Sequence, residues 1–150
     1  MNIRSVPYAE AVALADAMSR EMMTLYEDDE GASPAAAEEF LPPYGTFLVL
    51  TVAGEDVACG GLRLIAPGRG EVKRMYTRPS HRGKGHARTV LRALVEHARA
   101  VGLAQLWLET GVRQPEAIAL YESEGFTPIA PFGYFADHPE TLCFGRDLLS

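Results

Sequence analysis

The sequence has few cysteines, and its first residues contain no long hydrophobic run. The two cysteines, Cys59 and Cys143, stand far apart and form no C-x-x-C motif. Each lies in an apolar, strand-like segment, so we expect buried free thiols in a reducing cytoplasm, with a catalytic cysteine as the less favoured alternative. Residues 1–18 carry Arg4, Glu10 and Asp16 among their apolar side chains. We therefore expect neither a signal peptide nor a membrane-spanning segment there.

Basic side chains and metal-ligand patterns are also scarce. Lys and Arg total 14 against 20 Asp and Glu, and the net charge of −6 argues against nucleic acid as the main partner. The four histidines show no paired spacing such as H-E-x-x-H, so we predict no metal site. Internal repeats and low-complexity linkers are missing as well. The 150 residues, 47% of them hydrophobic, are enough for one domain spanning 1–150.

The hydrophobic pattern that is present predicts alternating helices and strands. We expect a strand at 2–6, a helix at 7–26 and a short helix at 35–40 capped by Ser33 and Pro34. Strands at 46–52, 57–65 and 71–77, joined by short turns at 54–56 and 66–70, predict an antiparallel meander. The adjacent Gly60 and Gly61 predict a bulge or a close backbone approach in the middle strand. Later helices and strands complete an α+β fold.

A strand, a Gly-rich turn and a helix follow one another between residues 72 and 101. Apolar residues at spacings of three and four from Ala87 to Val101 predict the helix, which Gly102 ends. Gly83 and Gly85 precede it, and glycine admits backbone conformations that let the main chain approach a ligand closely. The unpaired N–H groups and the positive dipole at the start of a helix favour phosphate oxygens. We therefore predict that a phosphate-bearing ligand binds at this turn.

The turn differs from the two commonest phosphate motifs. It has two glycines two residues apart, rather than the G-x-x-x-x-G-K-[ST] of a P-loop or the three glycines of a dinucleotide fold. Its pattern is R-x-x-G-x-A, formed by Arg82, Gly85 and Ala87, with Pro79 three residues ahead and Lys84 adding positive charge. A second motif follows: a strand at 104–109, then the helical run Q-x-x-A-x-x-L-Y-x-x-x-G-F at 114–126.

These two motifs, in this order and spacing, resemble those of the GNAT superfamily of N-acetyltransferases, in particular its bacterial small-molecule branch. Gln114 stands where the family's second motif begins with Asn, and the other positions match. The resemblance covers residues 45–146 and is specific between 71 and 126. It implies a mixed, mostly antiparallel sheet with helices on both faces and a splayed pair of strands that holds acetyl-CoA.

The resemblance also implies roles for individual residues. Acetyl-CoA is expected as co-substrate, with backbone N–H groups of Met75, Tyr76 and Thr77 binding its pantetheine and acetyl carbonyl where the strand splays. Gln114 is expected to contact the cofactor in place of the family's Asn. The phenol of Tyr121 is expected to protonate the departing thiolate, although a tyrosine on an amphipathic helix can also belong only to the core. The pyrophosphate is expected at the turn formed by Arg82, Gly83, Lys84, Gly85, His86 and Ala87.

Two carboxylates are candidates for the base that deprotonates an amine acceptor. Glu71 is the first candidate, because it lies eleven residues before Arg82, where some members of the family carry a strand glutamate. Glu109, near the end of the neighbouring strand, is the second. The alternative for each is a carboxylate paired with a cation, and Lys73 shares the face of Glu71 by the two-residue period of a strand.

The N-terminal helix–loop–helix region is, by the same resemblance, one wall of the acceptor pocket. Its acidic run at 27–30 could attract an ammonium substrate, but a solvated loop is the favoured interpretation. Residues 130–139 are rich in aromatic side chains and are expected either to form a pocket rim or to pack as an ordinary loop. The sequence does not specify the acceptor.

The leading hypothesis is therefore a cytoplasmic N-acetyltransferase that moves an acetyl group directly from acetyl-CoA to a primary amine of a small molecule or amino acid. Two alternatives remain: a protein or peptide N-acetyltransferase, and a CoA-binding sensor without catalytic activity. We expect no nucleic-acid or membrane partner, and the oligomeric state, including a homodimer, stays open.

Overall fold

A computed structural model describes residues 1–26 and 34–149 of the chain. The sheet has seven strands in the order β1-β2-β3-β4-β5-β7-β6, and β4 and β5 are its one parallel pair within the described residues. The strands are β1 (Asn2–Ser5), β2 (Thr46–Val52), β3 (Glu55–Ala66), β4 (Arg69–Thr77), β5 (Gln105–Gly111), β6 (Thr127–Ile129) and β7 (Thr141–Asp147). The α-helices are α1 (Val12–Tyr26), α2 (His86–Ala100) and α3 (Pro115–Ser123). Short 3-10 helices are η1 (Tyr8–Ala11), η2 (Ala37–Phe40) and η3 (Pro79–His81).

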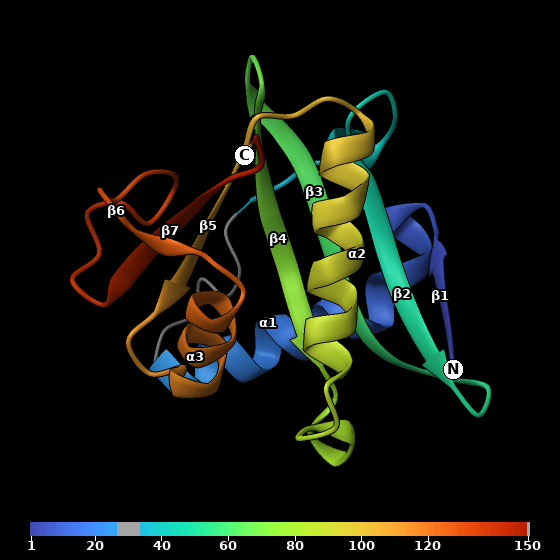
Figure 1. The fold of residues 1–150 in the computed structure, drawn as a ribbon. Coiled ribbons are helices and arrows are strands. Elements are labelled where there is room, and N and C mark those ends of the chain that lie inside the picture. Colours follow the sequence, from blue (N-terminus) through green and yellow to red (C-terminus); the bar gives the residue numbers. More distant parts are fainter. Residues whose placement is uncertain (27–33, 150) are drawn as a thin grey trace.

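Helices cover both faces of this sheet, which confirms the predicted α+β architecture. Helix α2 lies along the front of the central strands in Figure 1, and α1 crosses behind them. The α2 side is filled by the predicted apolar stripe, in which Leu91 and Leu94 are fully buried against strand residues such as Leu62. Full burial of each leucine stabilises the fold by about 2 kcal/mol. A second cluster, on the α1 side, includes Phe40 and Phe47.

The meander of β2, β3 and β4 is antiparallel, as the sequence predicts. At Gly60 and Gly61 side chains pack closely against the strand backbone. A Cβ at Gly60 would lie 2.5 Å from Met75 Sδ, and one at Gly61 would lie 2.7 Å from the rings of Phe40 and Phe47. The pairing also shifts register between Cys59 and Gly61, so a bulge interrupts the ladder here.

Strands β4 and β5 pair over only a few residues and then separate. The parallel ladder joins Arg69 to Gln105 and ends where Val72 pairs with Leu108. Beyond this point β4 stays on β3 as far as Thr77, while β5 stays on β7 as far as Gly111. The separation is the splayed strand pair that the sequence resemblance implies, and it opens the sheet on the side where the Gly-rich turn begins α2.

The N-terminal region follows the prediction in part. The predicted helix is present as η1 followed by α1. The predicted helix start at residue 35 is two residues early, because η2 begins at Ala37 after Ala36, whose N–H donates to Glu39 Oε1 at 3.1 Å. Of the two predicted capping residues, Ser33 lies outside the described residues and Pro34 is not the cap. The predicted turn at 54–56 also lies earlier, since β3 already begins at Glu55. The acidic run at 27–30 lies outside the described residues. Within the described residues, no helix is both long enough and apolar enough to cross a membrane.

Candidate functional site

A pocket of about 1150 Å³ lies where β4 and β5 separate. Side chains from five parts of the chain line it: α1, the far half of β4, the turn and first residues of α2, the end of β5 with α3, and the loop before β7. Among the described residues that line it, β4 contributes Lys73 and Arg74, β5 contributes Glu109, and α3 contributes Tyr121. The two motifs identified in the sequence therefore meet in one cavity.

The Gly-rich turn has the backbone geometry that its glycines predict. Gly83 and Gly85 have φ values of 77° and 82°, a left-handed conformation that other residues adopt with strain. A Cβ at either position would meet no atom within 4 Å, so the space beside the turn is open to a ligand. Thr89 N donates to Gly85 O, which is the first hydrogen bond of the helix. The N–H groups of His86 and Ala87 precede this bond and have no acceptor within the helix. The turn therefore fits a phosphate group.

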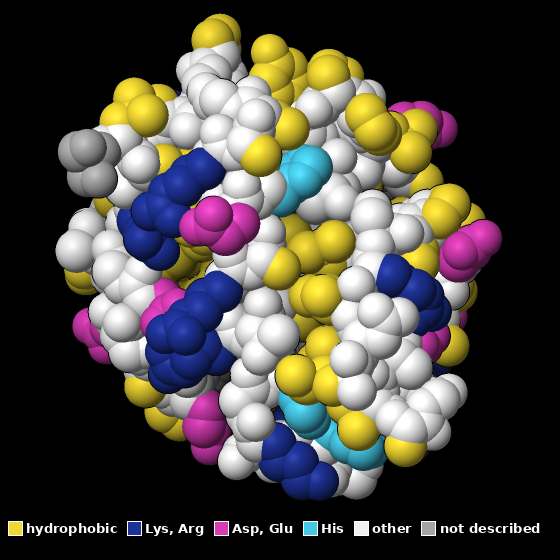
Figure 2. All heavy atoms as spheres, turned by 45° about the vertical axis from the view of Figure 1, so that its right-hand side comes forward, with side chains coloured by type: hydrophobic (Ala, Val, Ile, Leu, Met, Phe, Trp, Pro, Cys, Tyr) yellow, Lys and Arg dark blue, Asp and Glu magenta, His cyan; other side chains and the backbone are white. Residues whose placement is uncertain are grey.

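One of the two basic side chains of this turn, that of Arg82, is paired with a carboxylate of the protein. Arg82 Nη2 lies 2.6 Å from Glu21 Oε2 on α1, and Arg82 Nε donates to Thr77 O at 2.9 Å. Lys84 is exposed beside it. Basic and acidic side chains also lie next to one another on the face shown in Figure 2. Arg88 on α2 forms an ion pair with Glu124, the residue after α3.

The segment from Met75 to Thr77 borders the gap left by β5. N–H groups along a strand point alternately to its two sides, so part of this segment faces the pocket instead of a neighbouring strand. The hydroxyl Oγ1 of Thr77 is buried and, among the described residues, has no hydrogen-bond partner. A buried polar atom of this kind calls for an explanation, and a ligand group in the pocket supplies one. This segment therefore fits a polar cofactor chain.

Tyr121 belongs both to the core and to the pocket wall. Its ring centroid lies 6.0 Å from that of Phe126 and 6.5 Å from that of Phe144, and the residue is 6% exposed. Burial raises the pKa of its phenol, so the hydroxyl stays protonated at neutral pH. The two interpretations left open by the sequence are thus compatible in space, and the phenol is in the form that can donate a proton.

Gln114 is joined to α1 by a residue that the sequence interpretation missed. Gln114 Nε2 and the backbone N of Arg113 each lie 3.3 Å from the hydroxyl of Tyr26. The tyrosine fits because β5 ends in glycine: a Cβ at Gly111 would lie 1.7 Å from the Tyr26 hydroxyl oxygen. A glycine at the end of a strand was the available clue, but only the fold shows which side chain fills that space.

Glu71 is held in a buried ion-pair network. Its Oε1 lies 2.8 Å from Arg63 Nη2, and its Oε2 lies 3.7 Å from Lys73 Nζ. Arg63 in turn pairs with Glu39. Glu71 is 2% exposed, and it is not among the described residues that line the large pocket. The pairing with Lys73 that the strand period predicts is therefore present.

Glu109 has a different environment from Glu71. It lines the pocket, and its Oε2 would lie 3.3 Å from a Cβ at Gly133, so the loop before β7 passes close to it. Burial lowers the pKa of Lys73, and the charges of Glu71 and Glu109 oppose this shift without cancelling it. The pocket therefore holds a cation and a carboxylate on neighbouring strands. Lys73 and Arg74 are pocket residues to which the sequence interpretation gave no role in the site.

The remaining predictions concern the aromatic segment 130–139, metal ligands and the two cysteines. Phe135 and His138 line the pocket, so part of the segment 130–139 forms its rim. Among the described residues, no group of three or more His, Cys, Asp or Glu side chains could hold a metal ion. Cys59 and Cys143 are both free thiols and both buried.

Comparisons with known proteins agree with this geometry. The family model of the acetyltransferase (GNAT) family matches residues 12–126. The chain is 42% identical over 103 residues to "IAA acetyltransferase" of Azospirillum brasilense, covering 68% of this chain and 67% of that protein. It is 34% identical over 128 residues to the uncharacterized N-acetyltransferase YsnE of Bacillus subtilis, covering 84% and 85%. A solved structure from Klebsiella pneumoniae, provisionally named an acyl-CoA N-acyltransferase, has 32% identity, a TM-score of 0.81 and coverage of 99% and 97%.

Proposed function

Because the chain belongs to the GNAT acetyltransferase family, we propose that it transfers the acetyl group of acetyl-CoA directly to a primary amine of a small molecule, within one domain spanning 1–150. The observation that carries this proposal is the single pocket at the splayed strands. It brings the phosphate-binding turn, the exposed edge of β4, Glu109 and Tyr121 to one cavity. A CoA-binding sensor would need only the first two of these.

The cofactor, when bound, supplies an acetyl thioester. The turn at 82–87 would hold its pyrophosphate through backbone N–H groups and the helix dipole. Gln114, at the start of α3, would contact the cofactor beside Tyr26. Backbone N–H groups of the segment Met75 to Thr77 would bind the pantetheine and polarise the acetyl carbonyl, and preorganised donors of this kind often contribute about 10²–10³ in rate.

Glu109 is the base that the geometry favours. An alkylammonium must lose a proton before it attacks, and a carboxylate on the pocket wall can accept that proton directly or through water. Glu71 is held by Arg63 and Lys73 and is nearly inaccessible, so a role through Lys73 is more compatible with its position than direct contact with the acceptor. This ranking reverses the order proposed from sequence alone.

The reaction then balances with two protein groups. The amine nitrogen forms a bond to the acetyl carbon, and the carbon–sulfur bond breaks. Glu109 takes the proton that the ammonium loses before the attack, and Tyr121 gives its proton to the departing thiolate. The nitrogen loses a second proton as the amide forms, and this proton restores the Tyr121 phenol, so that the thiol and Glu109 each end with one of the two protons. Burial raises the pKa of Tyr121, which keeps the proton on the phenol at neutral pH until the carbon–sulfur bond breaks and also makes the phenol a weaker acid.

A thiol-release assay with acetyl-CoA tests the proposal. The acceptor panel contains small amines, amino acids, short peptides with free N-termini or lysine, and IAA, because one relative carries that name. Release of CoA with a small amine supports the proposal, and release only with peptides favours the protein-acetylating alternative. Tight binding of acetyl-CoA without release for any acceptor would favour the sensor.

A further inference from the structure

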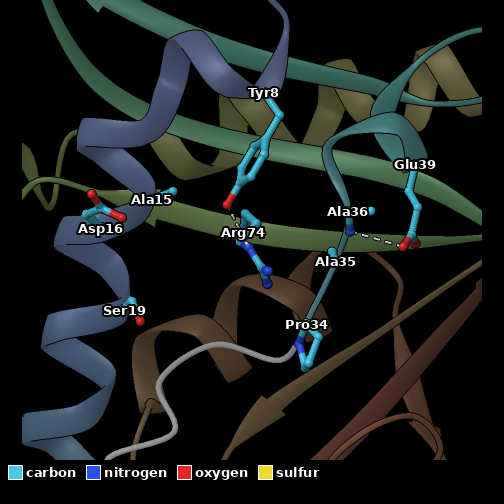
Figure 3. Close-up of a pocket in the computed structure, with 9 residues that line it drawn as sticks. All are labelled: Tyr8, Ala15, Asp16, Ser19, Pro34, Ala35, Ala36, Glu39 and Arg74. Atoms are coloured by element: carbon cyan, nitrogen blue, oxygen red, sulfur yellow. Dashed lines mark hydrogen bonds between the residues drawn. The ribbon is translucent and has the colours of Figure 1, made fainter.

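A second pocket, of about 630 Å³, lies between α1 and the segment that leads into η2. Its charged side chains are Arg74, Asp16 and Glu39, and the hydroxyls of Tyr8 and Ser19 complete its polar lining. Figure 3 shows Arg74 extending between α1 on one side and residues 34–36 on the other. Because Arg74 lines both this pocket and the large pocket at the splayed strands, it stands at their junction.

Arg74 reaches this position because β4 is irregular. Lys73 is opposite Gly61, whose Cβ direction meets Phe40 and Phe47 on the α1 side of the sheet. In a regular strand the next residue would point to the α2 side. Instead the pairing resumes at Cys59 and Tyr76, so two residues of β4 face Gly60 alone, and Arg74 takes a φ of 62°. The bulge thereby sends the Arg74 side chain to the same face as Lys73.

This conformation is unfavourable for arginine and is compensated by its surroundings. Left-handed backbone is disfavoured for residues with a Cβ. Such strain persists only where surrounding contacts fix the residue, and strained residues cluster at functional sites. Arg74 Nε donates to the hydroxyl of Tyr8 at 3.2 Å, as drawn in Figure 3. The Tyr8 ring is itself packed against Phe40 and Phe47, with ring centroids 5.1 and 4.9 Å away. The guanidinium is therefore held in one orientation by an aromatic cluster.

The charges around Arg74 indicate which ligand the pocket suits. Glu39 is already engaged, because it pairs with Arg63 and accepts from Ala36 N. Asp16 is exposed on α1, and Figure 3 shows it on the opposite wall from Glu39. Because Arg63 pairs with Glu39, the guanidinium of Arg74 and the carboxylate of Asp16 set the charge of this pocket, which suits a singly charged anion better than a dianion. The planar guanidinium matches a carboxylate in particular.

Together with the proposed function, on which this step rests, these observations lead us to infer that Arg74 binds the carboxylate of the acceptor, and that the acceptor is a small amino-carboxylic acid. Its carboxylate lies in the second pocket and its amine reaches Glu109 through the junction at Arg74. Simple amines and amides lack the group that Arg74 recognises. Tyr8 acts as a positioning residue, because it contacts the guanidinium and not the acceptor.

The test compares acceptors that differ only in the carboxylate. Alanine, methionine and phenylalanine are each assayed as the free acid, as the amide and as the decarboxylated amine, with saturating acetyl-CoA. We expect kcat/KM to be about 10- to 100-fold higher for the acid than for its amide, the range expected for a hydrogen bond to a charged group. The amine of the amide is less basic, so more of it is neutral at a given pH, and amine ionisation alone would favour the amide.

Variants then assign the preference to Arg74. Arg74→Gln should reduce the acid-to-amide ratio to near one while acetylation of the amide changes less than threefold. Arg99→Gln, which removes the same charge from an exposed site at the end of α2, should keep the wild-type ratio. Tyr8→Phe should raise KM for the acid several-fold with little change in kcat. A ratio near one in the wild type, or a ratio unchanged in Arg74→Gln, overturns the inference while the transferase function stands.

A binding measurement covers the remaining outcomes. With CoA present, the amino acid should raise the melting temperature of the wild type and the amide should not, and Arg74→Asn should lose this difference. Asparagine tolerates the left-handed conformation, so Arg74→Asn should fold even if Arg74→Gln does not. If no acceptor releases thiol from acetyl-CoA, the proposed function fails and this binding measurement alone decides the inference. Equal effects of acid and amide on the wild type would overturn it.

Discussion

Glu21 on α1 and Arg82 in the Gly-rich turn form an ion pair of 2.6 Å between Oε2 and Nη2. The pair connects α1, which lines the large pocket, with the turn proposed to bind pyrophosphate. A phosphate at the turn would compete with Glu21 for the same guanidinium. Both side chains are partly exposed, so the pair contributes at most about 1 kcal/mol, and salt weakens it further.

Removing this competitor should strengthen cofactor binding. Glu21→Gln is expected to lower the Kd for acetyl-CoA by about two- to fivefold at low salt, the range that an exposed ion pair supports. Calorimetry at two salt concentrations measures the change. Glu96→Gln, which removes the partner of Arg99 on the exposed side of α2, should leave the Kd unchanged. Weaker binding by Glu21→Gln would show instead that Glu21 helps to position Arg82.

Gly85→Asp should abolish acetyl-CoA binding. The substitution places a side chain and a negative charge where phosphate oxygens are proposed to approach, and it strains a φ of 82°. Gly102→Asp is a matched control, because Gly102 has a φ of 84°, has no atom within 4 Å of its Cβ position, and lies at the other end of α2. Both variants should lose about 1–2 kcal/mol of stability. Calorimetry should show lost affinity in Gly85→Asp alone, and equal affinities would contradict the assignment of the turn.

Tyr121→Phe should lower kcat more than it raises the KM for acetyl-CoA. The ring contacts with Phe126 and Phe144 survive the change, so the fold should keep its melting temperature to within a few degrees. General acid catalysis typically contributes about 10²–10⁴ in rate. Steady-state kinetics with a slow acceptor, where chemistry limits turnover, makes the measurement. A loss of less than twofold would leave Tyr121 with a role in the core only.

Glu109→Gln and Glu71→Gln separate the two candidate bases. We expect Glu109→Gln to reduce kcat/KM by about 10²-fold and to remove the acidic limb of its pH profile, while acetyl-CoA affinity is retained. Glu71→Gln removes the carboxylate that pairs with the buried Lys73 and with Arg63, which keeps Glu39, so it should chiefly destabilise the protein, by about 3 kcal/mol.

Three outcomes of this comparison are informative. Slowing by Glu71→Gln alone, in a folded protein, would restore Glu71 as the base. Slowing by both would indicate that the charge network from Glu71 through Lys73 to Glu109 acts as a unit. If neither variant is slower with a more basic acceptor, deprotonation occurs in bulk water and the enzyme works mainly by positioning the reactants.

Alkaline pH should destabilise the fold through Cys59. Burial raises the pKa of this thiol from 9.0 to about 12. A group whose pKa is higher in the folded state stabilises the fold below its unfolded pKa, and this contribution is lost as pH rises from 9 toward 12. The expected loss is about 1.4 kcal/mol at pH 10 relative to pH 8. Urea unfolding at both pH values tests this, and Cys59→Ala should show a correspondingly smaller difference between them.

The sequence predicted the local features of this protein better than it predicted the long-range contacts. The apolar spacing from Ala87 to Val101 and the stop at Gly102 predict α2 well, because periodicity and left-handed glycine are properties of a short segment. Gly83 and Gly85 predict the left-handed turn before α2 for the same reason. Gly60 and Gly61 indicate a close approach in β3, and the structure confirms it.

The tertiary structure decided what these local features face. Lys73 and Arg74 are adjacent in the sequence, yet only the bulge in β4 and the packing of Tyr8 on Phe40 and Phe47 place Arg74 beside the second pocket. The sequence ranked Glu71 ahead of Glu109 as a strand carboxylate, but the exposure of each depends on where β4 leaves β5 and on partners far along the chain. Backbone preference and hydrophobic periodicity depend on a few neighbouring residues, so they can be predicted from the sequence. Burial, ion pairing and the direction of a side chain across a sheet depend on segments that meet only when the chain is folded.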